Sequence, residues 1–553
     1  MNSKPIQILK LIFSVLLFNK RCSSLRQSDG LAEQFYYIAG VAEFRPEAIG
    51  TTDALSTHLQ AYKEMIGSVE AEDVDIIVFP EGTLNKDFQL TYVPSKKDNV
   101  IPCSLSEEDN IYADFLVELS CAAQRFKKYL VINLTEKEIC WINANDPRPC
   151  SHNGLNIFNT NVVFDRDGRV ISRYRKTHVY VENKNTSYEQ EYGIFETDFG
   201  VRFGHFICFD ILFYTPAQEL VERFGITDII FTSKFYSELP FLTAAQLQMG
   251  WSWGNNVNLL AAGASYPVNG STGSGIYAGE NGILVSVMVT GNVGERKLYK
   301  AKVPKRNLNI SLSNLTSSTM TAYNLPKYLR LLKDPQIENF NSILLNFQQE
   351  TDMDGKTLCH GNLCCQFNIS TSTMNSSMPN YYYRLGVFDG KRTYEKKEWN
   401  NIKICSLYAC VTESVSSCGE LSTPGNLNSS AVFLSISIKG LFKRSKHLLI
   451  MPNSLKSNLL PVPASKINWS KSLQGDSYEV SHQLTSETDN LLTFGIYANY
   501  YEGNAAERMH LSYFRKFYFL IMLYGFTDSS CINFQTTDKK KCVMIENTRE
   551  AEQ

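Results

Sequence analysis

The sequence predicts an α/β domain followed by a smaller β-domain that is rich in disulfides. Three observations lead to this fold class. The chain of 553 residues is too long for one compact domain. In its first half, apolar runs typical of strands alternate with segments that have helical periodicity, as expected for an α/β domain. From residue 359 onward, short alternating stretches and clustered cysteines replace this rhythm, as expected for a β-domain held by disulfides.

The first elements of the α/β domain follow the hydrophobic pattern. Runs of buried-type residues predict strands, and segments with apolar residues on one helix face predict the helices between them. In chain order these are strand 35–43, helix 51–69, strand 74–79, helix 111–128 and strand 129–134. The second strand runs into the turn Pro80-Glu81-Gly82, so Glu81 lies just beyond a strand end.

The middle of the chain is richer in strands. Residues 161–164 and 169–174 predict a hairpin around a glycine-containing turn, and Lys176 follows its second strand. Another apolar run ends in a turn at Cys208, with a helix expected soon after. Further predicted elements are the strands 228–231, 259–262 and 282–287 and a helix at 243–256.

A segment rich in Ser, Asn and Thr at 308–321 marks a domain boundary. We therefore expect a catalytic α/β domain over residues 31–320 and a β-domain over residues 335–505. The tail, 506–553, is atypical because its apolar stretch at 517–526 is too short to span a bilayer and a polar segment follows it. This pattern does not fit a lipid-anchor signal, so attachment to a membrane through such an anchor is not supported.

The N-terminus has the layout of a signal peptide. Lysines precede the apolar run 11–18 and small residues follow it, so we expect removal near residue 24. A secreted or cell-surface protein would accept glycans at its Asn-x-Ser/Thr sequons. We predict glycosylation at Asn185, Asn269, Asn309, Asn314, Asn368, Asn375, Asn428 and Asn468. A further sequon at Asn133 lies in an apolar strand, where its use is doubtful. The net charge of −2 gives no reason to invoke nucleic acid.

The 14 cysteines fit an oxidising compartment. One leaves with the leader and Cys208 is proposed to be free, so an even number remains for disulfides. Cys140 and Cys150 bracket a proline-containing loop and are expected to pair. Cys359 and Cys364 enclose a histidine, so a metal knuckle is the alternative to a disulfide there. No complementary histidine pair accompanies them, and no metal site is expected.

Three residues at predicted strand ends combine into one chemistry: Glu81, Lys176 and Cys208. A carboxylate can take the thiol proton and later deliver it to a leaving amine. An ammonium beside the thiol lowers its pKa and stabilises a tetrahedral oxyanion. The thiolate can then attack a carbonyl to give an acyl-enzyme. Taken singly, the same residues are ordinary: a turn carboxylate, a solvated cation, and a core thiol or half of a disulfide.

The residues around this constellation resemble a known family. The blocks that resemble the Glu, Lys and Cys motifs of the nitrilase (carbon-nitrogen hydrolase) superfamily are Phe79-Pro80-Glu81-Gly82, Arg173-Tyr174-Arg175-Lys176 and the run from Gly204 to Phe213. The last of these contains Cys-Phe-Asp-Ile-Leu-Phe, which is similar to the vanin/biotinidase branch of secreted amidases. Further blocks similar to this branch are 272–278, 358–365 and 385–390, so the resemblance covers residues 31 to 505.

The resemblance implies a four-layer αββα sandwich and a Glu-Lys-Cys triad that needs no cofactor and no metal. Glu81 would be the proton acceptor and donor, Lys176 the cation that stabilises the oxyanion, and Cys208 the nucleophile. Supporting roles are implied for Glu182 and for the backbone N–H of Phe209.

The resemblance also implies a secreted amidohydrolase whose partner is a small-molecule amide. The favoured substrate is pantetheine, which would give pantothenate and cysteamine. Biotinyl amides are the alternative substrates, and a catalytically silent binding glycoprotein of the same fold is the alternative function. The segment 232–237 differs from the Pro-Thr-Ala-Trp sequence associated with vanins and is expected to line the acyl pocket.

Overall fold

The computed structural model describes residues 35–47, 53–141, 149–306, 319–322, 328–347, 352–372, 381–394, 398–422 and 431–501. The predicted leader, the tail 506–553 and four of the predicted glycosylation sites lie outside the described residues. These four sites are Asn309, Asn314, Asn375 and Asn428.

Two sheets form the centre of the catalytic domain. One has six strands in the order β13-β1-β2-β3-β4-β5, and the other has seven in the order β14-β12-β11-β10-β8-β7-β6. The strands of the first sheet are β1 (Tyr36–Phe44), β2 (Ile76–Val78), β3 (Tyr129–Ile139), β4 (Leu155–Phe164), β5 (Val170–Arg175) and β13 (Arg296–Pro304). Those of the second are β6 (Gly193–Glu196), β7 (Arg202–Ile207), β8 (Asp228–Ser233), β10 (Asn258–Gly263), β11 (Ser274–Ala278), β12 (Ile283–Met288) and β14 (Thr319–Ala322).

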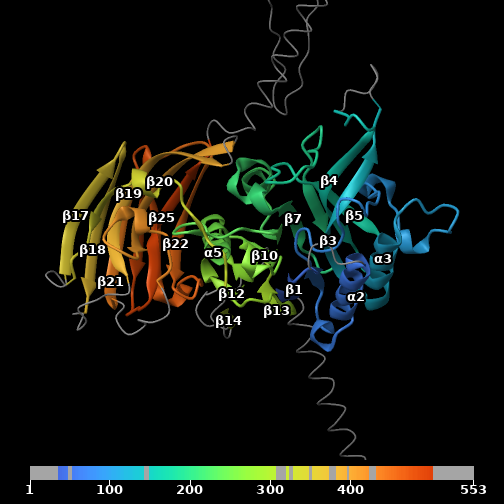
Figure 1. Ribbon diagram of the computed structural model, residues 1–553, viewed down its shortest axis with the longest axis horizontal. Helices are drawn as coiled ribbons and strands as arrows, with labels where there is room; N and C mark the ends of the chain where they lie inside the picture. Colours follow the sequence, from blue (N-terminus) through green and yellow to red (C-terminus); the bar gives the residue numbers. More distant parts are fainter. Residues whose placement is uncertain are drawn as a thin grey trace, which may run out of the picture. The chain divides into compact units, whose positions relative to one another are not determined.

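Helices cover the outer faces of both sheets, which confirms the four-layer αββα arrangement. Helices α2 (Ala54–Ile66) and α3 (Asp114–Phe126) share a core cluster with the first sheet (Figure 1). Helix α5 (Ala244–Asn255) packs on the second sheet. A separate apolar cluster, which includes Val41 and Leu260, fills the space between the sheets. In the part of the chain described here, no helix is both long and apolar enough to cross a membrane.

Most predicted elements of this domain have the predicted type, and the hairpin before Lys176 is confirmed, since residues 160–164 of β4 pair with β5. Strands β3 and β4 are longer than predicted. Strand β3 continues to Ile139, and β4 begins at Leu155 rather than at residue 161. The two strands pair over their whole length, and the Cys140–Cys150 disulfide closes their far end as expected. The helix expected soon after Cys208 is short, since 3₁₀ and π turns precede α4 (Glu219–Glu222).

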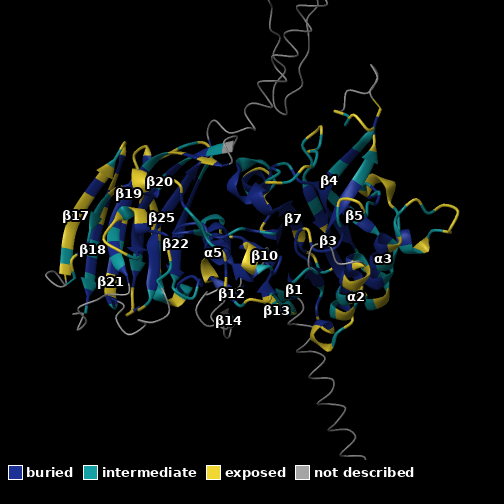
Figure 2. Cartoon of the chain, viewed as in Figure 1, coloured by how far each residue is buried: buried dark blue, intermediate teal, exposed yellow. Residues whose placement is uncertain are grey.

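The C-terminal domain consists of two five-stranded antiparallel sheets. One contains β16 (Asn341–Leu344), β19 (Tyr382–Tyr394), β20 (Glu398–Cys410), β25 (Leu491–Tyr500) and β22 (Leu448–Lys456). The other contains β17 (Asp352–His360), β18 (Leu363–Thr371), β21 (Phe433–Lys443), β24 (Ser477–Leu484) and β23 (Ile467–Gln474). Strand β18 alternates buried and more exposed residues, while most of the edge strand β17 is exposed (Figure 2). This alternation is typical of a sheet with one face on a core.

The two domains pack tightly where α5 meets β22. Gly250 and Gly254 of the helix face the carbonyl oxygens of Pro452 and Ile450. A Cβ atom at either glycine would lie only 2.7 or 2.8 Å from those oxygens, so only glycine allows this approach.

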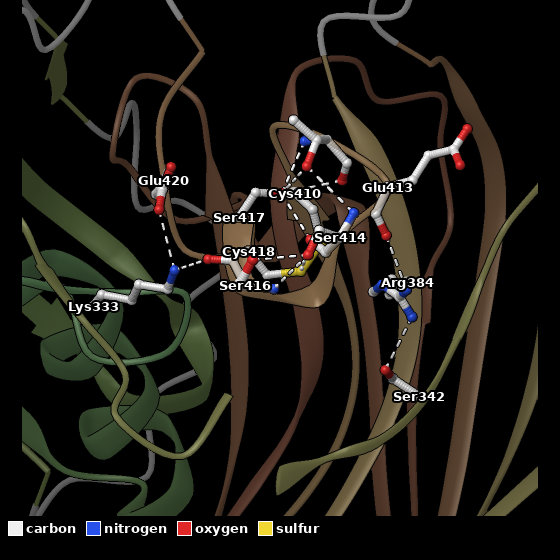
Figure 3. Close-up of a disulfide and its surroundings, with 11 residues drawn as sticks. Lys333, Ser342, Arg384, Cys410, Glu413, Ser414, Ser416, Ser417, Cys418 and Glu420 are labelled. Carbon is white, nitrogen blue, oxygen red and sulfur yellow. Dashed lines mark hydrogen bonds and ion pairs between the residues drawn. A yellow bond between two sulfur atoms is a disulfide. The ribbon is translucent and has the colours of Figure 1, made fainter. Parts of the chain in front are cut away.

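Disulfides brace the C-terminal domain. Cys365–Cys405 joins its two sheets, and Cys359–Cys364 closes the turn between β17 and β18, so the metal alternative for that pair is wrong. Cys410–Cys418 closes a loop at the end of β20 (Figure 3).

The loop closed by Cys410–Cys418 is tied to the catalytic domain through one lysine. Lys333 Nζ donates to the carbonyl oxygen of Ser416 and lies 3.1 Å from Glu420 Oε1 (Figure 3). Lys333 belongs to β15 (Leu332–Lys333), which pairs with β9 (Glu238–Leu239).

Candidate active site

The strand directions bring the predicted site residues to one edge of each sheet. In the first sheet, β2 runs parallel to β3, and β5 has the same direction because two antiparallel pairings separate it from β3. Glu81 and Lys176 therefore leave the same edge. In the second sheet β7 runs parallel to β8, so Cys208 and Lys234 also leave a common edge.

Glu81 is held by hydrogen bonds on both carboxylate oxygens. Its Oε1 accepts from Lys176 Nζ at 2.7 Å and from Asn159 Nδ2 at 2.8 Å. Its Oε2 accepts from the backbone N–H of Lys234 at 2.8 Å, which links the two sheets. The side chain is buried and fully engaged, so its position relative to Lys176 is fixed.

The turn after Glu81 depends on a buried asparagine. Gly82 has a φ of 65°, and its N–H donates to Asn133 Oδ1 at 2.9 Å. Asn133 Nδ2 in turn donates to the side chains of Asn159 and Asn161. Asn133 is 1% exposed, so its sequon lies inside the protein, in keeping with the doubt raised by its apolar strand.

Lys176 lies between two carboxylates. Its Nζ is 2.7 Å from Glu81 Oε1 and also 2.7 Å from Glu182 Oε1. The structure thus brings Glu182 into the site beside the ammonium. Val181, just before Glu182, has a φ of 49°, an unfavourable conformation for a β-branched residue. Such strain is found where surrounding structure fixes a functional side chain.

Cys208 follows β7 directly and forms no disulfide, so the alternative of a structural disulfide at this position is wrong. Its φ of 47° makes a sharp turn from the strand into the segment Cys208–Leu212. Asp210 closes this turn, because its Oδ2 accepts from the N–H of Ile207 at 3.1 Å. A thiol presented on such a strand-to-helix turn is suited to nucleophilic attack.

Asp210 also ties the turn at Cys208 to the chain on both sides of Lys176. Its carboxylate accepts from the hydroxyl of Tyr174 at 2.7 Å and from the N–H of His178 at 2.9 Å. Burial raises the pKa of Asp210 to about 7, although Lys176 and these hydrogen bonds act in the opposite direction.

The protonation states follow from burial and from the charges in contact. Burial raises the pKa of Glu81, but the Lys176 ammonium and the hydrogen bonds together lower it by more, so the pKa lies below its ordinary value. Burial lowers the pKa of Lys176, but Glu81, Cys208 and Glu182 raise it well above the ordinary value. Burial and the Glu81 charge raise the pKa of Cys208, against the effects of Lys176 and the Lys234 N–H. At neutral pH the site therefore holds a carboxylate, an ammonium and a neutral thiol.

The asparagines and the Lys234 N–H that support this triad were not predicted from the sequence. A signal was present, because Asn159 and Asn161 stand two residues apart in a strand that is largely buried. They therefore face the same side of the sheet, and a buried amide requires partners. Only the pairing of β3 with β4 shows that the partner is Asn133.

The predicted glycosylation sites within the described residues differ in environment. Asn269 and Asn468 are exposed, and Asn368 is half-buried. Asn185 is half-buried and its Oδ1 accepts from the N–H of Ile157 at 2.8 Å. Asn269 and Asn468 are therefore the most accessible of these positions for a glycan.

Comparisons with known proteins agree with this architecture. Residues 44–236 match the family model for carbon-nitrogen hydrolases, and residues 329–504 match the model for the vanin C-terminal domain. Vanin-like protein 1 of Drosophila melanogaster is 45% identical over 504 residues, which cover 88% of this chain and 90% of that protein.

Two further relatives are enzymes by name. Pantetheinase of Homo sapiens is 31% identical over 385 residues, covering 66% of this chain and 70% of that protein. Biotinidase of Homo sapiens is 29% identical over 522 residues, covering 85% and 90%. The chain therefore belongs to the vanin/biotinidase branch of the carbon-nitrogen hydrolase family, and it is a hydrolase that acts on carbon–nitrogen amide bonds.

Proposed function

We propose that this chain cleaves pantetheine into pantothenate and cysteamine through a cysteine acyl-enzyme. The observation that carries the proposal is the buried Lys176, held between Glu81 and Glu182 and acting with Glu81 on the free thiol of Cys208. A binding module has no need for a buried ammonium that two carboxylates fix beside an unpaired thiol, because burying such charges is costly.

The first half of the reaction forms the acyl-enzyme. Glu81 starts ionised and takes the Cys208 proton as the sulfur attacks the amide carbon. Lys176 and the backbone N–H of Phe209 stabilise the negative charge that develops on the carbonyl oxygen. The carbon–nitrogen bond then breaks, and Glu81 returns its proton to the leaving amine.

The second half releases the acid. Glu81, ionised again, takes a proton from water while the water oxygen attacks the thioester carbon. The carbon–sulfur bond breaks and the proton returns to the Cys208 sulfur. Glu182 keeps Lys176 in place through both halves, so we assign it a positioning role.

Pantetheine is favoured over biotinyl amides because the relative named pantetheinase is 31% identical against 29% for biotinidase. The difference is small, so a direct comparison decides between them. Purified protein should release cysteamine from pantetheine faster than lysine from biocytin, and Cys208→Ala should release neither. Faster cleavage of biocytin would assign the biotinidase activity instead, and no cleavage of either would contradict the proposed substrates.

We also propose that the protein is secreted. The leader pattern and five disulfides among the described residues support this location. Expression in animal cells should give a medium form that starts near residue 25 and loses mass on treatment with an N-glycosidase. Retention in the cell with an intact N-terminus would contradict secretion.

A further inference from the structure

The segment after β8 forms part of the wall beside the nucleophile. Tyr236 lies near Tyr180, with ring centroids 6.4 Å apart, and Tyr180 packs against Phe209 at 4.8 Å. Phe209 is the residue after Cys208. Lys234 stands two positions before Tyr236, and both side chains are only partly buried. In an extended segment, residues two apart lie on the same side.

The backbone of Lys234 is fixed by the catalytic carboxylate. Its N–H donates to Glu81 Oε2 at 2.8 Å. The Lys234 side chain extends over Gly82, since its Cδ lies 4.0 Å from the point where a Cβ at Gly82 would be. The side chain therefore starts at one side of Glu81 and passes over the residue that follows it.

The charge on Lys234 differs from those of its neighbours because it lacks a counter-ion. Lys176 is balanced by two carboxylates, and Lys184 lies 3.5 Å from Asp87 and 3.8 Å from Glu182. Among the described residues, no carboxylate lies within 4 Å of the Lys234 ammonium. Lys234, whose backbone is bonded to Glu81, thus carries a charge that no carboxylate of the described residues balances and that can pair with a group outside the chain.

We propose that Lys234 is a specificity-determining residue that binds an anionic group of the substrate, a phosphate or a carboxylate remote from the scissile amide. This inference rests on the proposed amidase site, because the backbone of Lys234 is fixed there by its bond to Glu81. A lysine ammonium is a mobile point charge that accepts either anion. Among pantothenoyl amides, those with an acidic group on the acyl part or on the amine part should therefore be cleaved in preference to neutral ones such as pantetheine.

Two pairs of substrates test whether the bound anionic group lies on the acyl part or on the amine part. Pantetheine and 4′-phosphopantetheine differ by a phosphate on the acyl part. The pantothenoyl amides of aniline and of 4-aminobenzoate differ by a carboxylate on the amine part. We expect kcat/KM of the wild type to favour the anionic member of one pair about tenfold, as for a charge-assisted bond. Lys234→Met should lower that ratio to about one, and Lys234→Arg should keep it.

The matched control is Lys302→Met, which removes an exposed lysine from the edge strand β13 and should leave both ratios unchanged. The proposal is overturned if the wild type prefers the neutral member of both pairs, or if Lys234→Met keeps the wild-type ratios.

A second measurement does not depend on the substrate. Iodoacetate and iodoacetamide both alkylate thiols, but only the first is an anion. We expect Lys234→Met to lower the iodoacetate-to-iodoacetamide rate ratio at Cys208 about threefold at low salt, with no change in Lys302→Met. If no pantothenoyl amide is cleaved, the proposed substrate fails, and this ratio alone decides for or against the role of Lys234. An unchanged ratio would overturn it.

Discussion

The hydroxyl of Tyr174 donates a 2.7 Å hydrogen bond to Asp210 Oδ2, and this bond joins the strand that ends just before Lys176 to the turn that begins at Cys208. The other oxygen of Asp210 accepts from the N–H of His178, on the far side of Lys176. The buried carboxylate of Asp210 thus positions Cys208 relative to Lys176. Tyr174 lies on β5 of the first sheet and Asp210 follows β7 of the second, so their hydrogen bond also fixes how the two sheets meet at the site.

Tyr174→Phe should lower kcat about tenfold with little change in KM. The variant leaves a buried carboxylate one donor short, which costs about 1–3 kcal/mol and loosens the turn that carries Cys208. The Tyr174 bond also lowers the pKa of Asp210, so its loss should move any Asp210-dependent step of the pH–rate profile upward from about 7. Stopped assays over pH 5 to 9 would measure both effects.

The control for Tyr174→Phe is Tyr299→Phe, which removes a 2.8 Å bond to Glu295 on the first sheet. It should cost stability without changing kcat or the pH profile. Equal kinetic effects in the two variants would mean that Tyr174 has only a structural role.

Cys208→Ala should abolish amide cleavage while the yield of folded protein stays near normal. Cys208 forms no disulfide, and alanine fills most of its buried space, so folding does not depend on the sulfur. Cys418→Ala makes the opposite change, because it breaks the Cys410–Cys418 bridge and should lower the yield through a loss of about 2–4 kcal/mol. Measurable Cys208-independent turnover would remove the acyl-enzyme mechanism.

Lys176→Met should lower kcat/KM by at least about a hundredfold and also destabilise the fold. The loss of rate follows from the missing oxyanion charge. The loss of stability, about 3–5 kcal/mol, follows because Glu81 is left as a buried carboxylate without a counter-ion, while Glu182 keeps only Lys184, 3.8 Å away. Adding Glu182→Gln should recover part of the thermal stability but none of the rate. Equal recovery of both would show that Lys176 acts only as a structural ion-pair partner.

The grouping of Glu81, Lys176 and Cys208 could be predicted from sequence because each residue follows a predicted strand. Strands β2, β5 and β7 have short, buried patterns, and Glu81, Lys176 and Cys208 follow each of them closely. The four-layer arrangement could be expected from the family resemblance. The Cys140–Cys150 pair could be expected from local spacing, because the two cysteines bracket a short loop.

The supporting residues could not be found in the same way because they depend on contacts between strands distant in sequence. Asn159 reaches Glu81 only through the register of β4 with β3, and Asp210 reaches Tyr174 across two sheets. A local pattern shows that an asparagine is buried, but not which group it meets. For Lys234 the sequence predicted only that its segment lines the acyl pocket, because its backbone bond to Glu81 joins residues that are 153 positions apart.

Glu43→Gln should remove a pH dependence of stability that the wild type shows between about pH 4.5 and 7. Glu43 is completely buried, and its carboxylate accepts from Ser274 at 2.6 Å and from Thr272 at 2.7 Å. Burial raises its pKa from 4.5 to about 7. Between these values the folded state holds a proton that the unfolded state has released, so the free energy of unfolding falls as the pH rises, by about 3 kcal/mol in total.

The measurement is guanidinium unfolding of both proteins from pH 4.5 to 7.5. Asp210 also has a pKa raised to about 7, and its titration contributes the same slope to both proteins, so it cancels in their difference. Relative to the wild type, Glu43→Gln should therefore gain stability as the pH rises and level off above pH 7. Parallel curves would mean that Glu43 is ionised in the folded protein throughout this range, with its charge balanced by the two hydroxyls and the N–H of Gly273.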